Sequence, residues 1–376
     1  MKRLVLVLSI LLAFALCGCA ALLETSGYEK EPYQEPTPAV EAADSGKVEN
    51  YNQLTTALIS AVAEHREQAT ILFQNYEGDI SADLEAACRE VQQESAIGAF
   101  AVEEFSYEIR RIVSYYEAEL TTRYRRTEEQ VVGLVSLSGT RAVRERLAQA
   151  LEAGETYLAI HMPATTLTAE RMRELLQESY FQYAGGALCL PMAEVAVYPE
   201  GEGIQRVFEL YLDYGLEQEE RETRMAALGT AIEDGLASVV QAGGSLEDLA
   251  NYLTETVRPG ASGEWASTAY GALVEGQADS QGLALAFSAI CRAGGLETQV
   301  AEGSLYGENR FWNLVALGEG RWGHCDVTTL RDHGTGPFLA GDTEMAGYIW
   351  NRERYPAAVG IEDGMAPTLK LPEVTE

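Results

Sequence analysis

Three closely spaced stretches decide the fold of this chain: GQADSQGLALAFSAI at residues 276–290, GENRFWNLVAL at residues 307–317 and RWGHCDVTT at residues 321–329. The first has the form of a tight turn that leads into a helix, with Leu283, Phe287 and Ile290 on one apolar face. The other two predict strands, because residues 311–316 alternate between two faces and glycines follow at the turn. The sequence therefore predicts a turn, a helix and two strands, in that order.

This order of elements, ending in Asp326, resembles the core of the transglutaminase-like superfamily, whose papain-like site holds Cys, His and Asp. The family pattern is roughly G-K-A-V-C-x-G-Y-A, then H-A-W-N, then W-x-H-V-D-x-T. The likeness begins before the site, in residues 267–273, and continues past it through Asp342 and Trp350, so that it covers roughly residues 246–356. It implies an α+β fold with a papain-like core, in which a helix packs on an antiparallel sheet.

The sequence departs from the family pattern at two of the three catalytic positions. Ser280 stands where the family has its nucleophilic cysteine, Arg310 stands where it has histidine, and only Asp326 remains. A guanidinium stays protonated and has no acceptor site, so Arg310 is excluded as a general base. In serine enzymes, loss of the base costs on the order of a millionfold in turnover. We therefore expect a degenerate triad, no catalytic residue of the family's kind, and a pseudoenzyme.

The same positions also have structural interpretations. A serine at a helix start is most simply an N-cap whose hydroxyl accepts a backbone N–H, and we expect this role for Ser280. We expect Arg310 to form an ion pair with Asp326, with Asp279 as a second partner. The alternative is an anion site, because Arg310 would face a helix N-terminus. The residues expected to contact a ligand are Arg310, Trp312 and Asp279.

Two further residues near Asp326 have side chains of chemical interest. His324 lies two residues before Asp326, on the same face of the predicted strand, and it is the one candidate for a replacement base. The family pattern commonly has a histidine there beside its catalytic one, so the resemblance implies a structural role. Cys325 points to the opposite face and is expected to belong to the core.

The N-terminus has the pattern of a secretory signal peptide. Lys2 and Arg3 precede an apolar run that ends in Leu16-Cys17-Gly18-Cys19, and this end resembles a bacterial lipobox with Cys19 as the lipidated residue. A plain signal peptide is the alternative. Residues 1–19 are therefore predicted as the signal, and residues 20–50 as an acidic, proline-containing tether. We expect a protein anchored to the bacterial cell membrane on its extracytoplasmic face.

Composition limits the partners. The 376 residues include 58 Asp and Glu against 27 Lys and Arg, a formal net charge of -31. Nucleic-acid binding needs Lys and Arg to displace counterions, so we expect no nucleic-acid partner. The four histidines are scattered and the cysteines lack metal-ligand spacing, so we expect no metal and no cofactor. Two disulfides among Cys88, Cys189, Cys291 and Cys325 would allow three pairings, which the sequence leaves open.

The rest of the chain shows local patterns without a family resemblance. It predicts helices at residues 51–73, 81–94, 141–153, 225–241 and 245–257, strands at 116–124 and 157–162, a helix capped by Thr168, and a hairpin from 194–198 to 207–214. The predicted domains are a smaller α/β domain at 51–220, the transglutaminase-like domain at 221–360 and a tail at 361–376.

Two functions remain from the sequence. The first is a cell-surface lipoprotein whose inactive transglutaminase-like domain binds a cell-wall peptide, a glycan or a surface protein. The alternative is a hydrolase or acyltransferase that uses Ser280 as a non-standard nucleophile, with His324 as its base.

Overall fold

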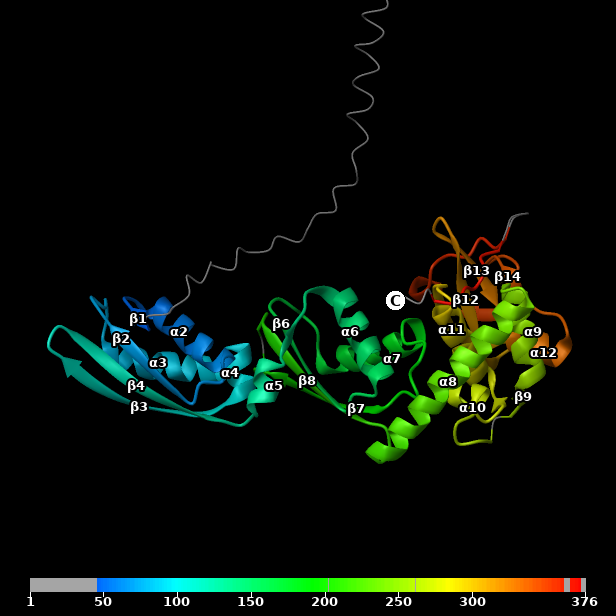
Figure 1. The fold of residues 1–376 in the computed structure, drawn as a ribbon. Helices are drawn as coiled ribbons and strands as arrows, with labels where there is room; N and C mark the ends of the chain where they lie inside the picture. The colour runs from blue at the N-terminus through cyan, green and yellow to red at the C-terminus, as the bar shows by residue number, and fades with distance from the viewer. Residues whose placement is uncertain (1–45, 202, 261, 362–365, 373–376) are drawn as a thin grey trace, which may run out of the picture. The chain divides into compact units, whose positions relative to one another are not determined.

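The computed structural model describes residues 46–201, 203–260, 262–361 and 366–372. The predicted signal peptide with Cys19, and most of the predicted tether, lie outside these residues. From Val48 onward the described residues form one compact unit. They are mixed α+β and contain two four-stranded sheets, a five-stranded sheet and a two-stranded sheet (Figure 1). The predicted α+β class is confirmed.

The first sheet has its strands in the order β1-β2-β4-β3. Helices lie on one face of it (Figure 1), and the buried side chains of the sheet, among them Ile71, Phe73 and Leu120, pack against these helices. The elements are β1 (Lys47–Val48), α2 (Tyr51–Ala63), β2 (Gln68–Phe73), α3 (Ile80–Gln93), α4 (Ala96–Ala101), β3 (Val102–Ile112) and β4 (Tyr115–Tyr124).

The prediction of one helix over residues 51–73 is wrong. Helix α2 ends at Ala63, the backbone reverses at His65 with φ 51°, and residues from Gln68 onward form β2. Ala69 and Leu72 fit the helical spacing of the preceding turns, but their segment pairs with β4, where Ala69 lies opposite Leu120. A distant strand thus decided the structure of a segment whose local pattern is ambiguous.

The second sheet has the order β5-β6-β8-β7, with one parallel pair, β5 and β6. The predicted helix at 141–153, strand at 157–162 and hairpin are confirmed, and the side chain of Thr168 accepts a hydrogen bond from Arg171 N as an N-cap. The elements are α5 (Glu128–Val132), β5 (Val135–Ser136), α6 (Gly139–Ala153), β6 (Tyr157–Met162), α7 (Ala169–Gln182), β7 (Met192–Tyr198) and β8 (Arg206–Asp213). The residues predicted as one small α/β domain thus form two mainly antiparallel sheets.

A buried ion pair lies between the end of β4 and strand β8. Arg126 Nη2 is 2.7 Å from Glu209 Oε2, and the side chains are 17% and 1% exposed. The hydroxyls of Tyr157, Tyr198 and Tyr211 also donate to the Glu209 carboxylate, at 3.1–3.2 Å. One carboxylate therefore satisfies groups from three strands and from the segment that follows the first sheet.

The third region holds the segments that resemble the transglutaminase-like core. Its five-stranded sheet has the order β14-β13-β12-β11-β15 and is antiparallel throughout. The elements are α8 (Gln218–Ala242), α9 (Leu246–Thr256), β9 (Arg258–Pro259), α10 (Ala269–Leu273), β10 (Gln277–Ala278), α11 (Ser280–Ala293), β11 (Thr298–Leu305), β12 (Glu308–Gly318), β13 (Arg321–Cys325), α12 (Val327–His333), β14 (Phe338–Ala340), β15 (Tyr348–Trp350) and η1 (Arg352–Arg354).

Helix α11 is the centre of this region. All of its residues from Gly282 to Cys291 are buried. Leu283, Phe287 and Ile290 pack with the inward side of the five-stranded sheet, while Ala284 and Leu285 belong to a second core cluster that also includes leucines of α6 and α7. A helix that is apolar all round is covered on every side. The predicted single apolar face was therefore too narrow, although the helix itself is confirmed.

Leu369, within the predicted polar tail at residues 361–376, is part of the folded core. Leu369 is only 3% exposed and belongs to the same core cluster as Phe287. Its backbone N–H donates to Gly244 O at 2.7 Å, and a Cβ on Gly294 would lie 2.8 Å from its side chain. One leucine in a polar segment thus packs its side chain against Gly294 and bonds through its backbone to Gly244, contacts that local composition does not show.

Candidate functional site

Asp326 is the most densely hydrogen-bonded residue at the degenerate triad. It follows β13 directly and caps α12, because its side chain accepts a hydrogen bond from Thr329 N at 2.9 Å. The hydroxyls of Thr329 and Tyr348 also donate to it, at 2.8 and 2.7 Å. The side chain is 0% exposed. Burial and the charge of Asp326 raise the pKa of Tyr348, so this hydroxyl remains a donor.

Arg310, near the start of β12, forms the predicted ion pair with Asp326. Its Nε donates to Oδ2 at 2.8 Å and its Nη2 to Oδ1 at 3.1 Å, and Nη2 also donates to the hydroxyl of Thr329. The arginine side chain is 15% exposed. Such a two-point contact holds the guanidinium in one orientation. Position 310 therefore carries a fixed cation and has no group that can accept a proton.

The predicted N-cap role of Ser280 is wrong by one residue. Asp279 caps α11 by accepting from Gly282 N at 3.0 Å, and the hydroxyl of Ser267 also donates to it. Ser280 is the first residue of the helix, and its Oγ accepts the backbone N–H of Phe311 at 3.3 Å. The serine thus does accept a backbone N–H, but from strand β12. A carboxylate is the stronger cap beside the positive end of a helix.

The structure weakens the anion-site interpretation of this position. Arg310 is neutralised by Asp326, and the N-terminus of α11 is already capped by the carboxylate of Asp279. In the described part of the chain, the ion pair of Arg310 is with Asp326 and not with Asp279. Neither positive element that would attract an anion is left without a negative partner.

Trp312 and His324 form a buried pair on the face of the sheet that lies away from α11, and the Trp312 ring packs against Tyr348. Trp312 is 1% exposed, so its ring lies in the interior. The expectation that Trp312 contacts a ligand does not fit this burial. Its Nε1 donates to His324 Nδ1 at 2.9 Å, and His324 Nε2 lies 2.9 Å from Asp342 Oδ1. Since an indole nitrogen only donates, Nδ1 is the acceptor and the imidazole proton is on Nε2, toward Asp342.

His324 is therefore placed as a structural residue and not as a base for Ser280. Both ring nitrogens of His324 have hydrogen-bond partners, and the ring packs among Trp312, Trp350 and their neighbours. Cys325, on the opposite face of the strand, packs with α11. Burial lowers the pKa of His324 below its usual 6.5, with an opposing contribution from Asp342. Cys325 is fully buried, and burial together with Asp326 raises the pKa of its thiol. The four described cysteines are free.

The lowered pKa of His324 predicts a loss of stability in acid. Below about pH 6.5 the unfolded chain takes up a proton at this residue and the folded chain does not, so the free energy of unfolding falls as the pH falls. Urea unfolding of His324→Gln should depend less on pH across this range than that of the wild type. The control is His333→Gln, at an exposed histidine, which should keep the wild-type dependence. Equal pH dependence in all three proteins would contradict the prediction.

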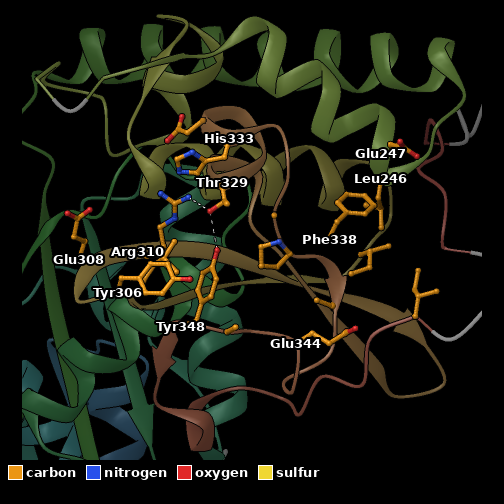
Figure 2. A pocket seen from close by; sticks show the side chains of 18 of the residues that line it. Leu246, Glu247, Tyr306, Glu308, Arg310, Thr329, His333, Phe338, Glu344 and Tyr348 are labelled. Carbon is orange, nitrogen blue, oxygen red and sulfur yellow. Dashed lines mark hydrogen bonds between the residues drawn. The ribbon is translucent and has the colours of Figure 1, made fainter.

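A cavity of about 1230 Å³ opens beside Arg310. Figure 2 shows Tyr306, Glu308, Arg310 and Tyr348 toward one end of it, and Leu246, Glu247 and Phe338 toward the other. Its walls come from the β11–β12 turn, α12, the start of α9 and the segments around β14 and β15. Ser280, Asp279 and Trp312 do not line it. The only expected ligand contact that it includes is Arg310.

Sequence reasoning did not find Thr329, Tyr348 or Tyr306. The spacing of Thr329, three residues after Asp326, is that of a helix cap and carries a signal. Tyr348 lies 22 residues away on β15 and reaches Asp326 only through the fold. Among the described residues, no group of three or more His, Cys, Asp or Glu side chains is placed to hold a metal ion. No helix in the described ranges is long and apolar enough to cross a membrane.

A central helix on an antiparallel sheet, with residues 280 and 310 on adjoining elements and Asp326 after the next strand, defines a transglutaminase-like fold. Residues 236–327 match the transglutaminase-like superfamily, so the C-terminal half of the chain carries a transglutaminase-like domain. A solved structure described as a crystal structure of a TGase aligns at 13% identity and a TM-score of 0.27, over 50% of this chain. The alignment spans 55% of that protein. No curated protein matches the sequence.

Proposed function

We propose that this chain is a lipid-anchored protein of the bacterial cell surface whose transglutaminase-like domain binds a peptide, a glycan or a protein without catalysis. The observation that carries the proposal is the Arg310–Asp326 pair. At the position where the family has its histidine, the guanidinium makes two hydrogen bonds to a buried carboxylate. An enzyme of this class needs a proton acceptor there, and arginine offers none.

Three features of the site support binding in place of chemistry. The hydroxyl of Ser280 accepts a backbone N–H from strand β12, and the residue stands outside the cavity lining. The imidazole of His324 is engaged at both nitrogens, which argues against the alternative in which it activates Ser280. The cavity beside Arg310 is large enough for several residues or sugar units, and its size exceeds that of ordinary small-molecule pockets. Anchoring through Cys19 rests on the lipobox pattern alone.

The proposal predicts that a substitution that blocks the cavity weakens ligand binding. It also predicts that the protein shows no catalytic activity. The exposed Ala346 lines the cavity, so Ala346→Trp should fill it and weaken ligand binding about tenfold or more. The control, Ala226→Trp, makes the same change at an exposed position of α8 and should bind as the wild type does. Binding of neutral peptides, cell-wall fragments and oligosaccharides to the purified protein is measured by calorimetry.

The same protein is assayed for amide hydrolysis and transamidation. We expect neither reaction, and no difference between the wild type and Ser280→Ala. Turnover that disappears in Ser280→Ala would replace the binding module with an enzyme that uses Ser280. Ligand binding that survives Ala346→Trp would place the binding site elsewhere on the chain.

A further inference from the structure

The turn between β11 and β12 contains a tyrosine whose backbone conformation is unfavourable for an aromatic residue. Tyr306 and Gly307 are the two turn residues, and both have positive φ, 51° and 90°. Two-residue hairpin turns of this kind favour Asn-Gly, because most side chains are strained at positive φ whereas asparagine and glycine tolerate it. Strain at an exposed position indicates a role other than folding. The residue is a tyrosine where asparagine would be more stable.

The ring of Tyr306 is exposed to solvent but is held in place by contacts on one side. It is 82% exposed and lines the cavity beside Arg310. A Cβ added to Gly347 would lie 2.5 Å from its Cε1, so the ring rests against the bare backbone of that glycine. The backbone N–H of Tyr306 donates to Gly347 O at 2.9 Å, which ties the turn to the same residue. One side of the ring is supported while the remainder faces solvent at the cavity.

The charges around the cavity select the chemistry of its ligand. Four carboxylates line it, those of Glu247, Glu308, Asp332 and Glu344. Asp332 pairs with Arg331, and Glu344 accepts the backbone N–H of Gly341. In the described part of the chain, Glu308 makes no ion pair and no side-chain hydrogen bond. Arg310, the arginine of the lining, is already neutralised by Asp326. The lining of the cavity therefore carries a net negative charge, which attracts cations.

From these observations we infer that Tyr306 and Glu308 form a subsite for a positively charged side chain, Lys or Arg, of a peptide or protein partner. A cation over the face of an aromatic ring is attracted by the ring's electrons, and a nearby carboxylate adds a direct charge contact. Figure 2 shows both side chains at the same end of the cavity. The inference rests on the proposed binding function and names the class of ligand that this end of the cavity takes.

The test is a titration of the purified protein with blocked trilysine, with blocked trialanine as the neutral comparison, at about 150 mM salt. We expect trilysine to bind and trialanine to bind less. Tyr306→Ala and Glu308→Gln should each weaken trilysine binding about threefold, and the double variant about tenfold. Tyr306→Phe keeps the ring and should bind nearly as the wild type does.

Two controls separate this subsite from general attraction to an acidic protein. Glu85→Gln removes the same charge at an exposed position of α3 and should leave trilysine binding unchanged. Tyr306→Asn restores the favoured turn, so it should raise the midpoint of thermal unfolding while it weakens trilysine binding, which shows that lost binding is not lost folding.

The outcomes distinguish the inference from the proposed function. Absent trilysine binding, or equal binding by the wild type and the Tyr306→Ala, Glu308→Gln double variant, overturns the cationic subsite. If neutral peptides or oligosaccharides still bind in a manner that Ala346→Trp abolishes, the binding module stands and only the ligand class is wrong. If neither class of ligand binds, both the module and the subsite fall.

Discussion

Replacing Asp326 with alanine is expected to lower the free energy of unfolding by about 3–5 kcal/mol, because it leaves a buried arginine without its counter-charge. The carboxylate accepts five hydrogen bonds, two from Arg310, two from Thr329 and one from Tyr348. All of these donors would lose the acceptor that the fully buried Asp326 carboxylate provides. Urea unfolding of the wild type and the variant measures the change.

The partner substitution sharpens this prediction. In Arg310→Met the carboxylate of Asp326 keeps three donors, the N–H and hydroxyl of Thr329 and the hydroxyl of Tyr348. The loss should therefore be smaller than in Asp326→Ala, where Arg310 keeps only its contact with Thr329. Glu104→Ala is the control, because this glutamate forms an exposed pair with Arg123 and its removal should cost much less. A larger loss in Arg310→Met than in Asp326→Ala would contradict this account of the site.

Glu209→Ala is expected to have an effect of similar size, about 3–5 kcal/mol, at a place far along the chain from the candidate site. Arg126 is only 17% exposed and relies on Glu209 for charge compensation. Three tyrosine hydroxyls donate to the same carboxylate, and its negative charge contributes to the raised pKa of Tyr157, after the larger effect of burial. The variant removes the common acceptor of this group, so thermal or urea unfolding should show a large loss.

A double variant tests whether the ion pair is the cause. Arg126→Met combined with Glu209→Leu removes both charges, and it should recover much of the stability lost in Glu209→Ala, since an unpaired buried charge is the costly state. The control is Glu119→Ala, which removes an exposed carboxylate paired with Arg110 and should change stability little. If the double variant is no more stable than Glu209→Ala, the packing of this region and not its charge sets the cost.

The segments near the site could be predicted because their information is local. Helix α11, strands β12 and β13 and the pairing of Arg310 with Asp326 all follow from a pattern that spans about fifty residues. The exclusion of a general base at position 310 needs only the chemistry of the guanidinium. The match of residues 236–327 to the transglutaminase-like superfamily agrees with the resemblance noted from the motifs.

Other features of the site depend on which atoms the fold brings close together. Asp279 caps α11 in place of the expected Ser280. The reason lies in other segments, because Ser267 donates to Asp279 and the backbone of Phe311 donates to Ser280. Trp312 alternates correctly along its strand, but β15 and the loops around it cover its face of the sheet and bury it. An edge position would have left the same residue exposed.

By itself, the sequence determined the class of the C-terminal domain and the chemistry that position 310 cannot perform, since residue type and short-range periodicity are sufficient for both. Only the tertiary structure decided that residues 68–73 form a strand, that Leu369 belongs to the core and that the cavity opens beside Arg310 and Tyr306 but away from Ser280. Each of these results from contacts between segments far apart along the chain, whose energies outweigh local preferences.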